Sequence, residues 1–92
     1  MTELNSIEKI KHNMEIAMEW MSKLDYRISS VSVYDFGIYL IVEESSIEFL
    51  HKVLETAEEK EVSLNVARNS DSGFIYCTSD EIGLNIIFTE NK

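Results

Sequence analysis

Three residue types are scarce in the sequence: it contains no proline, three glycines and one cysteine, Cys77. A single cysteine cannot form an internal disulfide, which excludes a secreted framework held together by disulfides. The chain also lacks the glycine-rich loop, paired lysine and catalytic loop of a protein kinase. The tripeptide Asp35-Phe36-Gly37, which matches the kinase magnesium-binding tripeptide, is therefore interpreted as a turn.

Basic residues are also scarce, because 8 lysines and arginines stand against 17 aspartates and glutamates, for a formal net charge of -9. An excess of negative charge repels phosphate backbones and anionic lipid headgroups. Direct binding to nucleic acid or to a membrane surface is therefore disfavoured. A protein partner with a basic surface is favoured instead.

Long apolar runs are absent as well. No run approaches the ~18 residues of a membrane span, and residues 1–4 lack the basic and apolar regions of a signal peptide. We therefore expect a cytoplasmic protein. The hydrophobic fraction of 45% is nevertheless too high for a disordered acidic tail. We expect a single folded domain, residues 1–92, with a modest core.

Two segments show the three- and four-residue spacing of apolar side chains that is typical of amphipathic helices. The first runs from Leu4 to Leu24 and the second from about Ser46 to Lys60. The first helix is rich in methionine, and we expect its methionines to lie in the core: Met14, Met18 and Met21.

Residues typical of strands follow the first helix, at Tyr26–Tyr34 and Ile38–Val42. The short turn between them predicts a hairpin in which Gly37 takes the left-handed position of the loop. The alternation of apolar residues slips near Ser29 and Ser30, which predicts a bulge there or a strand that begins there.

Three further short strands are predicted after the second helix, at 62–66, 74–78 and 84–89. The element order is then α-β-β-α-β-β-β. Because the connections are short and the strands follow one another in sequence, we predict an α+β fold. It is an antiparallel sheet of about five strands with two helices packed on one face.

Acidic residues are concentrated around the second helix, where the segment from Glu43 to Glu61 holds seven acids and two lysines. Acids near the end of a helix oppose its dipole, so their presence there lowers stability. We predict a partner-binding surface made of these acids: Glu43, Glu44, Glu48, Glu55, Glu58, Glu59 and Glu61. A solvated helix face that serves only solubility explains the same residues and stays open as an alternative.

Ile16 and Trp20 form a second candidate feature, because they lie four residues apart at one edge of the apolar arc of the first helix. Tryptophan is enriched at the positions that dominate the binding energy of interfaces. If Trp20 is exposed, this edge is a candidate for partner binding.

No arrangement of residues predicts a catalytic, metal or cofactor site. Cys77 is expected to be a buried core residue. His12 and His51 are expected to be helical residues near the margin of the apolar face. The segment from Asn69 to Gly73 has some of the oxygen ligands of a calcium loop at the wrong spacing, so we interpret it as a turn.

Three functional hypotheses follow. The favoured one is a small acidic interaction protein, such as an inhibitor or immunity-type factor, whose helical acids mimic phosphate spacing and bind a basic site on a partner. The alternative is an acidic chaperone or adaptor that works as a homodimer, with a short strand such as Leu84–Thr89 at an open sheet edge. The third is a small enzyme built from His51, Cys77 and carboxylates.

Overall fold

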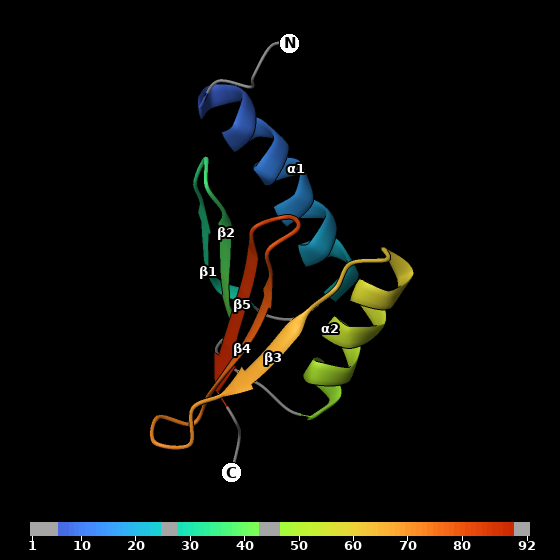
Figure 1. Cartoon of the computed structure of the whole chain (residues 1–92), viewed down its shortest axis with the longest axis vertical. Coiled ribbons are helices and arrows are strands. Elements are labelled where there is room, and N and C mark those ends of the chain that lie inside the picture. Colours follow the sequence, from blue (N-terminus) through green and yellow to red (C-terminus); the bar gives the residue numbers. More distant parts are fainter. Residues whose placement is uncertain (1–5, 25–27, 43–46, 90–92) are drawn as a thin grey trace.

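The computed structural model describes residues 6–24, 28–42 and 47–89 of the chain. Its element order is the one predicted from sequence, and the α+β class is confirmed (Figure 1). The helices and strands are α1 (Ser6–Leu24), β1 (Ile28–Val33), β2 (Ile38–Val42), α2 (Ile47–Glu59), β3 (Asn65–Arg68), β4 (Phe74–Ser79) and β5 (Leu84–Thr89). None of the helices in these ranges has the length and apolar character needed to cross a membrane.

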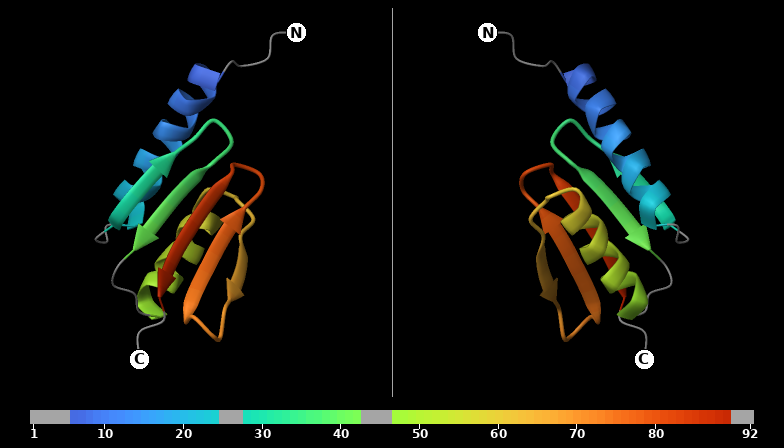
Figure 2. Two further views of the ribbon diagram at one scale, coloured as in Figure 1. Left: turned by 90° about the vertical axis from the view of Figure 1, so that its left-hand side faces the viewer. Right: turned by 90° about the vertical axis from the view of Figure 1, so that its right-hand side faces the viewer.

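The five strands form one mixed sheet in the order β1-β2-β5-β4-β3. The hairpins β1–β2 and β3–β4 are antiparallel, as is the pair β4–β5, but β2 and β5 are parallel. The prediction of an antiparallel sheet is therefore wrong for the central pair. After β2 the chain passes through α2 and the β3–β4 hairpin, and β5 then inserts beside β2 in the same direction (Figure 2). This position also makes Leu84–Thr89 a central strand, which removes it as an open edge.

The β1–β2 hairpin contains the predicted register shift, but its glycine, Gly37, does not have the predicted conformation. The register shifts between Ile28 and Ser30, as predicted. Gly37 is not in the left-handed region, since the described glycines with positive φ are Gly73 and Gly83. Gly37 is needed for a close approach instead: a Cβ there would lie 2.9 Å from the carbonyl oxygen of Gly83.

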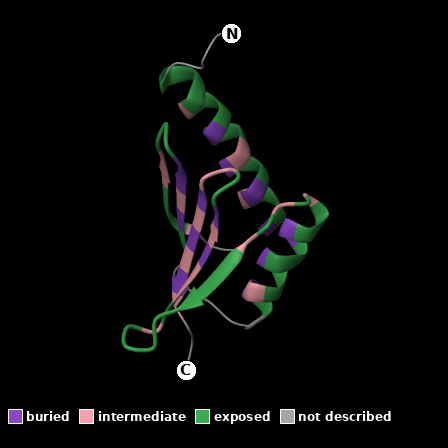
Figure 3. Ribbon diagram, viewed as in Figure 1, coloured by how far each residue is buried: buried purple, intermediate pink, exposed green. Residues whose placement is uncertain are grey.

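The third predicted strand lies later in the chain than expected. The sequence predicts it at 62–66, whereas β3 spans Asn65–Arg68. Leu64 packs against the core from the connection that precedes β3, so its apolar character reflects burial and not strand pairing. Every residue of β3 is exposed, as the uniform colour of this strand in Figure 3 shows.

One buried cluster holds the molecule together, and it joins residues of both helices to alternate residues of the strands. The ring centroids of Phe49 on α2 and Phe88 on β5 lie 4.9 Å apart in an edge-to-face contact. The shared cluster does not by itself establish that both helices pack on one face of the sheet, so that part of the prediction stays a prediction. Its members are Ala17, Trp20, Leu24, Ile38, Leu40, Val42, Phe49, Val53, Ala57, Cys77, Leu84, Ile86 and Phe88.

The methionines of α1 are placed differently from the prediction. Met14 is 48% exposed and Met18 is 64% exposed, so neither is a core residue. Met21 packs against the core as a partly buried side chain. The buried stripe of the helix is narrower than the sequence suggests, because Ala17, Trp20 and Leu24 occupy it together with Asn13.

Candidate functional site

The acids of α2 are where the sequence predicts them, on the exposed side of the helix. Glu55, Glu58 and Glu59 together line an open hollow of about 440 Å³. Glu48 is exposed about two to three turns before them. Glu43 and Glu44 lie outside the described residues. We call the described acids, Glu48, Glu55, Glu58, Glu59 and Glu61, the acidic surface.

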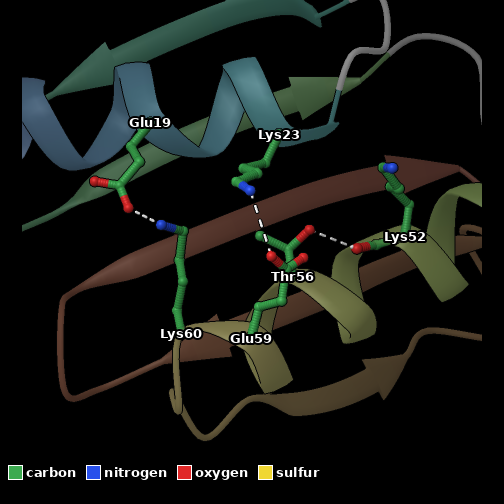
Figure 4. Close-up of polar contacts among 6 residues, drawn as sticks. All are labelled: Glu19, Lys23, Lys52, Thr56, Glu59 and Lys60. Atoms are coloured by element: carbon green, nitrogen blue, oxygen red, sulfur yellow. Dashed lines mark hydrogen bonds and ion pairs between the residues drawn. The ribbon is translucent and has the colours of Figure 1, made fainter.

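Two lysines meet acids between the helices, but they neutralise little of the acidic surface. Lys23 of α1 forms an ion pair with Glu59 at 3.3 Å, and Lys60 forms one with Glu19 (Figure 4). Both carboxylates are more than half exposed, so each pair contributes at most about 1 kcal/mol to stability. Within the described ranges, no lysine or arginine forms an ion pair with Glu55 or Glu58.

Glu61 lies at the turn that ends α2, in a backbone conformation that normally belongs to glycine. Its φ is 55°, in the left-handed region. Its N–H donates to the carbonyl of Glu58 at 3.1 Å, and the N–H of Val62 donates to the carbonyl of Ala57 at 2.9 Å. This pair of bonds is a Schellman cap, in which glycine is the usual residue at the left-handed position. A carboxylate there therefore opposes both the backbone preference and the helix dipole.

The second predicted feature, Ile16 with Trp20, is not an exposed edge. Trp20 is 1% exposed and belongs to the core, so the condition on which this candidate rested, an exposed Trp20, is not met. Its place in the buried stripe of α1 follows from the helical repeat that also buries Ala17 and Leu24. Ile16 is half-buried and, with Trp20 in the floor, lines a hollow of about 280 Å³ between the helices.

The residues of the predicted catalytic group lie in different surroundings. Cys77 is fully buried, as predicted, and this burial raises the pKa of its thiol to about 11. A thiol with this pKa stays protonated at neutral pH and is a poor nucleophile. His51 is exposed on α2, and His12 lines a separate hollow of about 260 Å³ beside Asp35 and Asp80. No group of three side chains in the described ranges could hold a metal ion.

The segment from Asn69 to Gly73 is a turn closed by its own side chain. The Asn69 Oδ1 atom accepts hydrogen bonds from the N–H of Asp71 at 3.0 Å and of Ser72 at 3.2 Å. The carbonyl of Asn69 accepts a third from Gly73 at 2.8 Å. The prediction of a turn at this segment is confirmed.

The sequence reasoning missed the face of the sheet opposite the core. Two rows of side chains cross all five strands there: Ser30, Ile41, Ile87, Tyr76 and Ala67 in one row, and Ser32, Tyr39, Asn85, Thr78 and Asn65 in the other. Phe74 and Thr89 begin a third row. None of these side chains is buried and none is charged. We call this set of residues the uncharged face; the left-hand view of Figure 2 shows the sheet that carries it.

Aromatic rings enlarge the uncharged face at the tip of the β1–β2 hairpin. The rings of Tyr34 and Phe36 are stacked with centroids 4.8 Å apart, and Tyr39 meets both edge-on at 5.8 Å and 6.4 Å. Phe36 is 69% exposed. The three rings, with Ile41, Ile87 and Ser32, line a shallow hollow of about 480 Å³.

A signal for the uncharged face was present in the sequence. In each strand the residues that alternate with the apolar core positions are serine, threonine, asparagine, alanine, aromatic or aliphatic residues. A solvent-facing row usually carries charges, especially in a chain with 27% charged residues. The absence of charged residues from every such position is recognisable once the alternation is counted.

Comparison of the chain with protein families, curated proteins and solved structures gave no significant match.

Proposed function

We propose that this chain is a small acidic interaction module that binds a basic site on a partner protein through the acidic surface, as an inhibitor or immunity-type factor does. The observation that carries the proposal is the end of α2, where Glu58, Glu59 and Glu61 stand against the helix dipole. Local features that lower stability tend to gather at functional sites. A basic partner would turn each of these unfavourable charges into a favourable one.

The cost of this arrangement can be estimated. Each exposed acid in the last turn of a helix opposes the dipole by roughly 0.3–1 kcal/mol. The left-handed backbone of Glu61 adds about 1 kcal/mol relative to glycine. Lys23 offsets part of this cost at Glu59, but Glu55 and Glu58 have no such ion pair among the described residues. The net cost is a noticeable part of the roughly 5–14 kcal/mol that stabilises a domain of this size.

The geometry suits a basic and extended site. Glu55, Glu58 and Glu59 are related by three and four residues, so their side chains are neighbours at about 5–6 Å on one helical side. This spacing is close to that of successive phosphates. It supports the idea that the acids mimic nucleic acid and bind the basic site of a nucleic-acid-binding protein. Opposite fields would also steer the two proteins together and make the association fall with salt.

A fluorescent octa-arginine peptide serves as the probe for the acidic surface. We expect binding, measured by fluorescence anisotropy at low salt, to weaken as salt rises. The double variant Glu55→Lys, Glu58→Lys should weaken binding about tenfold or more. The matched control Glu15→Lys, Asp71→Lys changes the net charge equally at exposed positions on α1 and the β3–β4 turn. Equal losses in both variants would show that bulk charge alone attracts the peptide and would contradict the proposal.

The edges of the sheet favour a second candidate, an acidic chaperone or adaptor that accepts a client strand. The edge strands are β1 and β3, and all of β3 is exposed. An open edge offers unpaired backbone groups to an added strand. This function predicts that the protein suppresses light scattering by heat-unfolded citrate synthase, and that Val66→Pro in β3 reduces the effect. Undiminished scattering with the unmodified protein would exclude it for this client.

A further inference from the structure

We propose that the uncharged face is the docking surface for a second copy of this chain, which forms a symmetric face-to-face dimer. The proposal does not depend on the function proposed for the acidic surface. It starts from the two rows of side chains that cross all five strands without a single charge. The face combines half-exposed tyrosine, phenylalanine and isoleucine side chains with uncharged polar ones, and both the aromatic residues and the lack of charge are typical of the central part of a protein interface.

The charge of the chain selects the occupant. At a net charge of -9, two copies repel each other, and any contact through charged surfaces would bring carboxylates together. The uncharged face lets two copies meet without burying a carboxylate on either side. A basic partner gains no ion pair from this face, and nucleic acid is repelled by the rest of the molecule. A second copy is thus the occupant whose charge pattern matches, because the same face on both sides is self-complementary.

The size of the face is sufficient for a dimer of moderate affinity. Five strands of four to six residues, each about 14–20 Å long and about 4.8 Å apart, give a face of roughly 440 Å² on each copy. The aromatic tip formed by Tyr34 and Phe36 extends it. Two such faces with their aromatic tips bury roughly 1,000 Å², which is the lower limit for a specific interface and is typical of a weak dimer.

The dimer leaves the acidic surface free. Phe88 contacts Phe49 of α2, and Ile87, the next residue back in β5, points to the opposite face. α2 therefore packs on the side of the sheet that the dimer does not use. Two acidic surfaces would then be presented by one assembly, and a partner with two basic sites would bind it with increased avidity.

The test compares one isoleucine and one leucine whose side chains are almost equally exposed. Ile41 on the uncharged face is 39% exposed, and Leu54 on α2 is 40% exposed. Sedimentation equilibrium of the unmodified protein should show a monomer–dimer equilibrium in the micromolar range. We expect Ile41→Glu to raise the dimer Kd at least tenfold, because it places two like charges at a symmetric interface. Leu54→Glu should leave the Kd unchanged.

Two further variants protect the test from ambiguity. Phe36→Glu lies in an exposed loop, so it should weaken the dimer without unfolding the protein, even if Ile41→Glu does not fold. Val31→Glu places a charge on the edge strand β1 at a side chain that is 43% exposed and outside the uncharged face. Loss of the dimer in Val31→Glu with retention in Ile41→Glu and Phe36→Glu would show pairing of sheet edges and overturn the proposal. A protein that stays monomeric at about 100 µM would overturn it as well.

Discussion

Two exposed regions of this molecule differ in how they use charge. The acidic surface of α2 collects carboxylates where the helix dipole disfavours them, whereas the uncharged face of the sheet has no charge on any strand. The first region is solvated, and among the described residues Lys23 is the one basic residue that forms an ion pair with it. The second has aliphatic and aromatic side chains among uncharged polar ones and is left half-exposed. A chain that separates its charges in this way has two surfaces of different chemical character, which is why we propose a different partner for each.

The largest expected effect comes from opening the core that supports both regions. Trp20→Ala removes the largest fully buried side chain and should lower the free energy of unfolding by about 3–5 kcal/mol. Phe36→Ala, at an exposed aromatic residue, should lower it by less than about 1 kcal/mol. Urea denaturation followed by circular dichroism measures both. Equal decreases in the free energy of unfolding would show that Phe36 stabilises the fold as much as Trp20 does. The aromatic tip would then be part of the core and not a surface feature.

An intermediate effect should appear at high pH and act on the sheet. The pKa of the Cys77 thiol is raised by burial to about 11 from 9.0, so folding favours the protonated form. This contribution is fully present below pH 9 and is lost as the pH rises toward 11, by roughly 1–2 kcal/mol. Cys77→Ala should remove that part of the pH dependence. Urea midpoints of the two proteins from pH 8 to pH 11 measure the difference, and parallel curves would contradict the expectation.

The smallest effect concerns the acidic surface. Glu61→Gly relieves the left-handed backbone and removes one acid that opposes the dipole, so it should stabilise the protein by about 0.5–1 kcal/mol. Glu15→Gly serves as the contrasting variant, since glycine inside α1 should destabilise by about 1 kcal/mol. Thermal unfolding at two salt concentrations measures both. If Glu61→Gly is destabilising, the acid at this cap contributes to the fold and its presence needs no functional reason.

The sequence predicts local structure well and long-range arrangement poorly. The helical repeat and the alternation of strand residues predict the order of the elements and place all of them well except β3, because these patterns depend on neighbours within a few residues. The parallel pairing of β2 with β5 depends on how segments more than forty residues apart meet, and no local pattern encodes it. The same limit explains Trp20: its position at the edge of an apolar arc leaves its burial to be decided by α2 and the sheet.

The candidate sites show the same division. The acids of α2 are readable from composition, because charge is a property of single residues. The uncharged face arises only when five separate strands are aligned, so that Ile41, Ile87 and Tyr76 become neighbours across the sheet. A search for strand positions that lack charge would have found it without the pairing register.

The central place of β5 has a consequence for the order in which the molecule assembles. β5 is the last of the described strands in sequence, yet it lies between the β1–β2 hairpin and the β3–β4 hairpin and pairs with both. During synthesis the two hairpins are complete before the segment that joins them leaves the ribosome. The sheet therefore closes only when Leu84–Thr89 arrives, and folding of the sheet as one unit must follow translation of that segment.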